Sequence, residues 1–216
     1  MIRETGSDTG ESNARVNFQS KLKFSKLKNV MRSSSVMSSK FFENYLDELC
    51  ARHEIEDTLK RFIRGIDRQD WQLALSTYHE GARDEHGFFN GPADEFLERV
   101  AQAHAHQEHS MHFMSNLLID FLACDVAVVE SYFLVFQRFG SEASGVIPGN
   151  SGVRKFATAR YIDRFEERHG TWRVARRVLV LGDMQEEQIT SPITMPTGFV
   201  MQKHSMEDYL YQVMGG

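Results

Sequence analysis

The chain has 216 residues, of which 41% are hydrophobic and 11% aromatic, so it can bury the core of one globular domain with appendages. Its formal net charge is −5, but residues 1–42 alone carry +5, which leaves −10 for the remainder. Because an acidic body repels phosphate backbones, we expect no nucleic-acid partner for the domain.

Cysteine usage and hydropathy predict the compartment. The two cysteines, Cys50 and Cys124, are too few for a disulfide framework or a cysteine-based metal site. No apolar run approaches the roughly 18 residues that a membrane span needs. The first residues also lack a hydrophobic stretch followed by a small-residue cleavage site. We therefore expect no membrane span and a reduced, cytoplasmic setting.

Residues 1–40 are predicted to form a disordered basic extension, because they are rich in Ser, Asn, Gly and Lys and contain few apolar side chains. Within this stretch, residues 21–28 alternate basic and apolar side chains. Two interpretations of the alternation stay open, a surface-binding patch and a solvated tail.

Residues 43–68 are predicted to form one or two amphipathic helices. Asp67 lies at angular offsets of about 40° from Ile63 and about 80° from Leu59 at 3.6 residues per turn, which places it at the edge of the apolar stripe. Asp70 is predicted to be the N-cap of a short helix over residues 71–78. Apolar side chains at helical spacing carry the prediction: Tyr45, Leu46, Leu49, Ile55, Leu59, Phe62, Ile63 and Ile66.

After these helices the spacing of apolar residues changes from helical to the alternation typical of strands. Residues 79–91 have turn formers at both ends and suit a short strand, and Pro92 marks the start of a third helix that ends near His106. The loop over residues 140–152 could border a site. Four strands are predicted, the last two joined by a turn at His169-Gly170: residues 112–121, 126–139, 156–167 and 171–182.

Helices followed by antiparallel strands define the α+β class, here a strongly curved, mainly antiparallel sheet wrapped around N-terminal helices. A pocket is expected between the helices and the sheet. Residues 41–183 are predicted to form this domain. Residues 184–216 follow as a tail with a short helix over residues 206–214, which could cover the pocket, pack on an oligomer partner or extend freely.

The strand that begins at His112 carries the main candidate residue. Side chains alternate faces along a strand, so His112, Met114 and Asn116 are expected on one interior surface. Two readings of His112 are open, a hydrogen-bonded core histidine and a catalytic base.

Other classes of site find little support in the sequence. It contains no Gly-rich phosphate loop, no Gly-x-Ser-x-Gly and no Cys and His pair with metal-ligand spacing. His79, Asp84 and His86 lack the spacing of a metal cluster. We expect no metal and no cofactor.

Several motifs together resemble a SnoaL-like domain of the nuclear transport factor 2-like superfamily over about residues 43–183. The resemblance implies a cone-shaped α+β barrel that encloses a hydrophobic cavity, usually as a homodimer or homotrimer. The order and spacing of short motifs carry it: Ile55–Asp70, Tyr78-His-Glu-Gly-Ala, Asp84-Glu-His-Gly, Asn90-Gly-Pro, His112-x-x-x-Asn116 and Gly170-Thr-Trp with Arg177.

Within that superfamily the chain is similar to the branch of hexachlorocyclohexane dehydrochlorinase, bile-acid 7α-dehydratase and, more distantly, scytalone dehydratase. The resemblance to the dehydrochlorinase implies that Asp67 and His112 form its catalytic pair and that Arg177 stands at its arginine. The tyrosine of the bile-acid enzyme corresponds only loosely to Tyr78. The segment that contains Asp84 and His86 lines the cavity mouth in this family, so both are candidate substrate contacts, as are Asn116 and Met114.

These residues permit removal of a proton from carbon without a cofactor. If Asp67 accepts a hydrogen bond from one ring nitrogen of His112, the other nitrogen can act as an oriented general base. Asn116 could orient the substrate. Arg177 could hold a leaving group or an enolate oxygen, or it could pair with a structural acid. The predicted activity is that of a lyase or isomerase, namely a dehydratase, dehydrohalogenase or double-bond isomerase, acting on a hydrophobic, cyclic small molecule.

Two non-catalytic alternatives stay open. The first is a module that binds a hydrophobic ligand in the same cavity, using the apolar side chains Phe113, Met114, Phe133 and Phe136. The second is an accessory subunit that resembles the small subunit of ring-hydroxylating oxygenases. That subunit shares the fold but lacks the His-x-x-x-Asn pattern.

Overall fold

The computed structural model describes residues 39–140, 152–190 and 196–215. Residues 1–38 of the predicted extension and residues 141–151 of the predicted loop lie outside this part of the chain. The chain divides into two units, Met1–Tyr45 and Leu46–Gly216. The described part of the first unit contains one turn of 3₁₀ helix, η1 (Ser39–Phe41).

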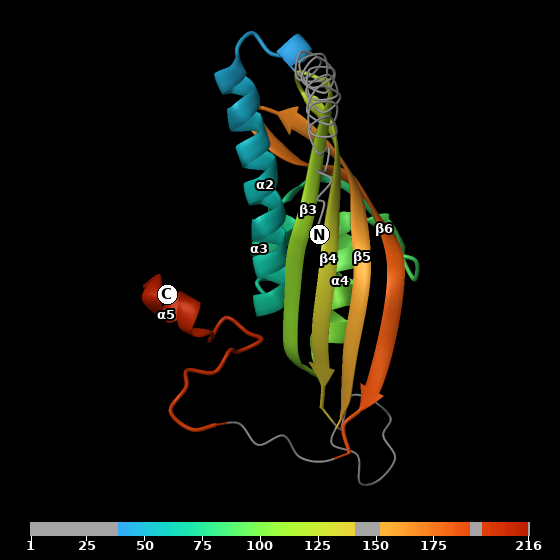
Figure 1. Cartoon of the computed structure of the whole chain (residues 1–216), viewed down its shortest axis with the longest axis vertical. Helices are drawn as coiled ribbons and strands as arrows, with labels where there is room; N and C mark the ends of the chain where they lie inside the picture. The colour runs from blue at the N-terminus through green and yellow to red at the C-terminus, as the bar shows by residue number, and fades with distance from the viewer. Residues whose placement is uncertain (1–38, 141–151, 191–195, 216) are drawn as a thin grey trace, which may run out of the picture. The chain divides into compact units, whose positions relative to one another are not determined.

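A curved six-stranded sheet forms the frame of the second unit (Figure 1). The strand order is β2-β1-β6-β5-β4-β3, so β2 and β3 are the edge strands. Neighbouring strands are antiparallel except β1 and β6, which pair in parallel. The strands are β1 (Tyr78–Glu85), β2 (Asn90–Pro92), β3 (Gln107–Ala123), β4 (Val126–Phe139), β5 (Val153–Arg168) and β6 (Thr171–Gln188).

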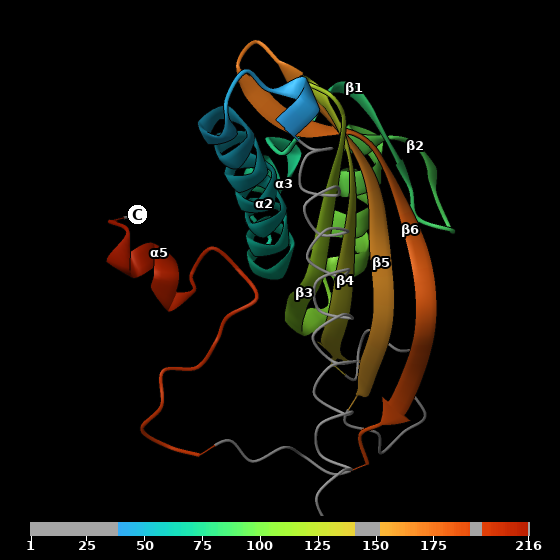
Figure 2. The same ribbon diagram turned by 45° about the horizontal axis from the view of Figure 1, so that its top comes forward.

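Helices cover one side of this sheet, as Figures 1 and 2 show for α2 and α4. The long N-terminal helix is continuous. The later part of its predicted apolar stripe is buried, including Ile55, Leu59, Phe62 and Ile66. The first three residues of that predicted stripe are exposed, namely Tyr45, Leu46 and Leu49. The α+β class predicted from the sequence is confirmed. The helices are α2 (Tyr45–Arg68), α3 (Trp71–Leu75), α4 (Ala93–His104) and α5 (Tyr209–Val213). None of these described helices is long and apolar enough to cross a membrane.

Local sequence signals explain two of the connections. Asp70 caps α3 as predicted, because its Oδ1 accepts from the Leu73 backbone N–H at 3.0 Å. The β5–β6 hairpin turns at His169 and Gly170, which both have positive φ (55° and 75°). Two successive positive φ values are the geometry of a tight turn that suits the twist of a hairpin.

An irregularity in β3 changes which of its side chains face the helices. Met114 stands opposite Phe133 of β4, but Leu117 stands opposite Ser131, so β3 has one extra residue in between. Such a bulge reverses the alternation of side chains beyond it. Asn116 is exposed as a result, and the prediction that it shares an interior face with His112 is wrong.

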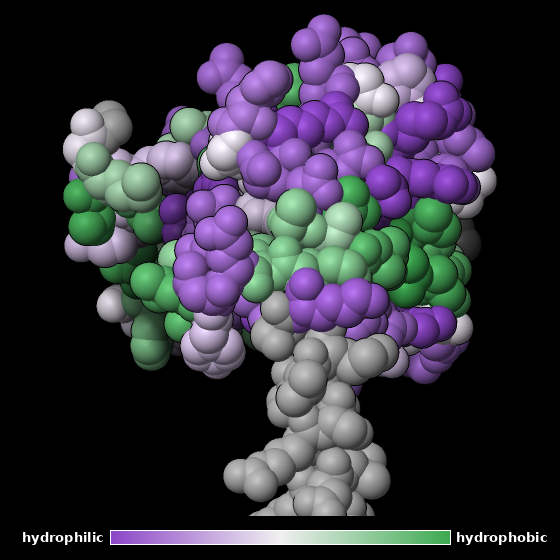
Figure 3. All heavy atoms as spheres, turned by 90° about the horizontal axis from the view of Figure 1, so that it is seen from above, coloured by the Kyte–Doolittle hydropathy of each residue, from purple (hydrophilic) through white to green (hydrophobic). Residues whose placement is uncertain are grey.

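The outer face of the sheet keeps apolar side chains in contact with solvent. The exposed residues include Phe113, Leu118 and Leu122 of β3 and Phe136 of β4. Seen from above, at right angles to the view of Figure 1, the molecule shows another gathering of hydrophobic residues, a band between hydrophilic zones (Figure 3). Contiguous apolar surface of this kind marks places where another molecule binds.

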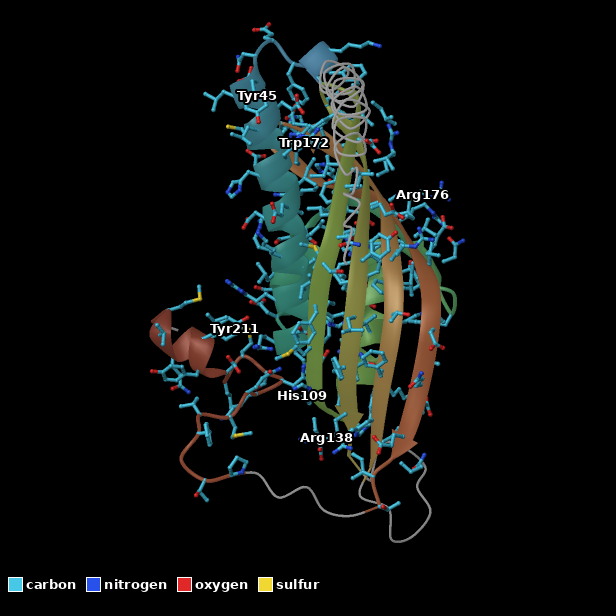
Figure 4. All side chains as sticks on the ribbon, in the orientation of Figure 1. Tyr45, His109, Arg138, Trp172, Arg176 and Tyr211 are labelled. Atoms are coloured by element: carbon cyan, nitrogen blue, oxygen red, sulfur yellow. The ribbon has the colours of Figure 1, made fainter. Side chains whose placement is uncertain are left out.

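The C-terminal segment, residues 196–215, packs against the end of α2. His204 Nδ1 donates to the carbonyl oxygen of Asp67 at 2.8 Å, and Tyr211 Oη donates to Asp70 Oδ2 at 3.0 Å. Gln202 Nε2 donates to the carbonyl oxygen of Ser110 at 2.9 Å. Figure 4 shows Tyr211 directed from α5 toward α2. The short helix predicted for residues 206–214 is present, although it spans only Tyr209–Val213.

Replacement of Gly65 by alanine should destabilise the fold. A Cβ at this position of α2 would lie 2.7 Å from the backbone nitrogen of Ala74 in α3. The resulting overpacking should lower the free energy of unfolding by about 1–3 kcal/mol, more than the gain in helix propensity. Urea denaturation checks this. Lys60→Ala, at an exposed position of α2, is the control and should change stability by at most about 0.5 kcal/mol. A Gly65→Ala protein as stable as the wild type would contradict the close approach.

Acid should weaken the fold through two buried histidines. Burial, followed by the charges of His204 and His112, lowers the pKa of His104 to about 3, and burial also lowers the pKa of His204. The two rings lie 5.4 Å apart. Below an ordinary histidine pKa near 6.5, the unfolded chain binds protons that the folded chain does not, so stability falls as the pH falls from about 6.5 toward 3.

Between pH 7 and pH 5, the folded protein should lose about 1–2 kcal/mol of stability through His104. Urea denaturation at the two pH values measures this loss. The His104→Gln variant has no titrating group at this position, so its loss should be smaller by that amount. An equal loss in both proteins would show that His104 is not held neutral.

Candidate functional site

A cavity of about 580 Å³ lies between the helices and the inner face of the sheet. Its volume falls within the usual range of about 300–1,000 Å³ for ligand sites. The polar groups that reach its wall include His86, His104, His112 and Tyr161. Most of its lining is apolar, from α2, α4 and strands β4 to β6, for example Phe62, Ile66, Phe96, Val100, Phe133 and Leu179.

Asp67 and His112 lie within hydrogen-bonding distance, as the family resemblance implied. Asp67 stands at the end of α2 and His112 on β3, and the distance from His112 Nδ1 to Asp67 Oδ1 is 2.6 Å. The carboxylate also accepts from the Ser110 hydroxyl and from the His112 backbone N–H, each at 2.9 Å. Burial alone would raise the pKa of Asp67, but the hydrogen bonds and charge of His112 outweigh it and lower the pKa below its ordinary value. Asp67 is therefore ionised.

The ionised carboxylate determines the tautomer of His112. Because Asp67 accepts at Nδ1, the proton of a neutral imidazole resides on Nδ1. Nε2 is then the nitrogen that can take a proton. His112 lines the cavity whereas Asp67 does not, so the pair presents the histidine to a ligand and keeps the carboxylate behind it.

Arg177 does not reach the cavity. Its side chain is fully buried and forms two hydrogen bonds with Asp163, from Nε to Oδ1 at 2.8 Å and from Nη2 to Oδ2 at 2.7 Å. The rings of Phe62 and Tyr161 lie 4.1 Å from its guanidinium carbon. The structure therefore places Arg177 in a pair with a structural acid, the second of the two roles considered from the sequence.

Tyr78, Asp84 and His86 form a connected group next to Arg177. Arg177 Nη1 donates to Tyr78 Oη at 3.1 Å, Tyr78 Oη donates to Asp84 Oδ2 at 2.6 Å, and His86 Nδ1 lies 2.5 Å from Asp84 Oδ1. Burial raises the pKa of Tyr78 well above its ordinary value, and Asp84 adds to the rise against the opposing charge of Arg177. Of the three residues, His86 alone lines the cavity.

The remaining predicted contacts lie away from this wall. Met114 is half-buried opposite Phe133, but it is not among the residues that line the cavity, and Asn116 is exposed. Phe113 and Phe136 line a separate hollow on the other side of the sheet. Among the described residues, no group of three or more His, Cys, Asp or Glu side chains could hold a metal ion.

Sequence reasoning missed Asp163, the partner of Arg177. A signal was available, because the turn at His169-Gly170 sets the register of the hairpin. Counting from that turn would pair Asp163 with Arg176, but an irregularity between Arg164 and Phe165 shifts the register and pairs it with Arg177. Only the neighbourhood of the pair could therefore have been predicted.

Many solved structures resemble this fold, among them the following three at low sequence identity. One is a hexachlorocyclohexane dehydrochlorinase, LinA type 3, from Novosphingobium barchaimii LL02, with a TM-score of 0.59 and 16% identity over 71% of this chain and 99% of that chain. Another is a scytalone dehydratase-like protein from Novosphingobium aromaticivorans DSM 12444, with a TM-score of 0.55 and 18% identity over 64% and 89%. The third is a protein of unknown function from Mycobacterium tuberculosis, with a TM-score of 0.51 and 23% identity over 65% and 78%.

At these identities the solved structures establish the fold alone. No curated protein matches the chain in sequence. The sequence model of the SnoaL-like domain matches residues 47–178, which is more than half of the chain and contains α2 from its third residue, all of the first five strands and the first half of β6. The chain therefore belongs to the SnoaL-like domain family of the nuclear transport factor 2-like superfamily.

Proposed function

We propose that this protein is a lyase or isomerase that removes a proton from a carbon atom of a hydrophobic, cyclic small molecule without a cofactor. One observation carries the proposal, namely a histidine on the wall of an apolar cavity whose far nitrogen is held by a buried, ionised aspartate. This is the arrangement of an oriented general base.

In the proposed reaction, Nε2 of His112 takes the proton. Asp67 stabilises the imidazolium that forms, because the carboxylate is already ionised and hydrogen-bonded to Nδ1. The electron pair of the broken C–H bond then expels a group from the neighbouring carbon, or the proton returns at another carbon. The first course is an elimination and the second a double-bond shift. Apolar walls support both courses, since they exclude water from the base.

Binding without catalysis is the competing function. The same apolar walls would hold a hydrophobic ligand. The Asp67 and His112 pair favours catalysis. Burying an ionised carboxylate costs desolvation free energy, and a site that only binds a hydrophobic ligand does not require such a group.

Replacement of either member of the pair should abolish most of the activity. Loss of an oriented base should lower kcat by about 10²–10⁴-fold in Asp67→Asn and His112→Gln. The probes are 3-hydroxycyclohexanone for elimination of water, γ-hexachlorocyclohexane for elimination of chloride and 3-cyclohexenone for isomerisation. The two ketone probes are followed by absorbance of the conjugated enone and the chlorinated one by chloride release.

His53→Gln, at an exposed position of α2, is the matched control and should retain wild-type turnover. Undiminished turnover in both variants of the pair would contradict the proposal. A wild-type protein that binds the probes without converting any of them would favour the binding module.

We further propose that the protein is a homodimer or homotrimer, on the basis of the apolar outer face of β3 and β4. Leu118→Glu with Leu122→Glu should shift sedimentation equilibrium to the mass of a single chain, because charge in a buried apolar interface is costly. Glu54→Gln, at an exposed position of α2, should keep the mass of the wild type. A wild-type protein that sediments as one chain at all concentrations would contradict this assembly.

A further inference from the structure

A second histidine, His86, reaches the cavity and is held in the same way as His112. Its Nδ1 lies 2.5 Å from Asp84 Oδ1, and each of the two histidine side chains is 12% exposed. The ring of His86 stacks on Phe96 with centroids 4.4 Å apart. The carboxylate and the stacking fix the ring, so Nε2 is the nitrogen that it offers to a ligand.

The hydrogen bonds behind His86 have defined directions, because Arg177 can only donate. Its donation to Tyr78 Oη leaves the Tyr78 hydroxyl to give its single proton to Asp84 Oδ2. The other oxygen of Asp84 faces the imidazole, and a carboxylic acid is a stronger acid than imidazolium. The proton between them therefore resides on Nδ1 of His86.

The charges of this buried group favour a cationic His86. Asp84, Asp163 and Arg177 are at most 1% exposed, and together they carry a charge of −1. Burial raises the pKa of Asp163 and the charge of Asp84 adds to the rise, whereas the charge and hydrogen bonds of Arg177 oppose it. A protonated His86 restores neutrality.

The environment of His112 differs in this respect. The Asp67 side chain is 8% exposed, whereas that of Asp84 is 0% exposed. Asp67 also has two neutral donors besides the imidazole ring, the Ser110 hydroxyl and the His112 backbone N–H. These neutral donors share in stabilising its negative charge, so a neutral, hydrogen-bonded His112 is compatible with it. Of the three described histidines that line the cavity, His112 is therefore suited to accept a proton and His86 to donate one.

We propose that His86 is the catalytic acid of this cavity and that the substrate is an alcohol whose hydroxyl group leaves as water. The assignment rests on the proposed function, because it takes His112 as the base. His112 Nε2 takes the proton from carbon, and the C–H electron pair becomes the C=C bond. The C–O bond breaks with its electron pair on oxygen, and oxygen takes the Nε2 proton of His86. Proton exchange with solvent then restores both histidines.

The leaving group distinguishes this role from simple binding. Hydroxide leaves poorly unless it is protonated, whereas acetate and chloride leave as stable anions. His86→Gln should therefore lower kcat on 3-hydroxycyclohexanone by about 10²–10⁴-fold and on 3-acetoxycyclohexanone by less than about 10-fold. His112→Gln should lower turnover of both probes. Equal losses on the two probes in His86→Gln, or turnover of the chlorinated probe but not the hydroxyl probe by the wild type, would overturn the assignment.

A measurement without substrate tests the charge directly. In ¹⁵N NMR spectra of the full-length protein at pH 7, both ring nitrogens of His86 should be protonated, whereas His112 should keep one bare nitrogen. The resonances are assigned by loss of signal in His86→Gln and His112→Gln, and Asp84→Asn should convert His86 to the neutral form. A neutral His86 in the wild type would overturn this inference and leave the proposed function intact. Inactivity on every probe would contradict the proposed function without bearing on the charge of His86.

Discussion

The side chain and carbonyl of Asp67 join three parts of the structure. The carboxylate binds Ser110 and His112 of β3, while the carbonyl oxygen accepts from His204 of the C-terminal segment. The end of α2, the first half of β3 and the tail thus meet at one residue. Removing one partner of a buried charge typically costs about 3–5 kcal/mol, so the geometry of this junction is strongly determined. His112, which lines the cavity, is held in place by the same contacts.

A second buried charge, the guanidinium of Arg177, holds together the group of residues behind His86. It connects β6 to Asp163 of β5 and Tyr78 of β1, and the ring of Phe62 from α2 lies against it. Through Tyr78 and Asp84 its influence reaches His86. Both histidines are therefore positioned by aspartates that the cavity itself does not expose. The two carboxylates thus lie behind the histidine side chains and outside the lining of the cavity.

The sequence predicted the elements that depend on local signals. The helical spacing of α2, the Asp70 cap and the turn at His169-Gly170 each depend on neighbours within a few residues. The Asp67 and His112 pair could be predicted because the resemblance to a family supplied the long-range contact. Asn116 was misplaced and Asp163 was missed for one physical reason, since each lies beyond an extra residue in a strand. Nothing in the residues themselves marks where a strand accommodates such an insertion.

β3 lies at one edge of the sheet that the described residues form. An edge strand presents carbonyl and amide groups on which another chain can assemble, and β3 is 17 residues long. Two of those carbonyls are occupied from outside the sheet, that of Ser110 by Gln202 and that of Ile119 by Arg52. The bulge between them interrupts the regular spacing that a pairing strand would need. These two contacts and the bulge therefore make the edge of β3 a poor template for a pairing strand.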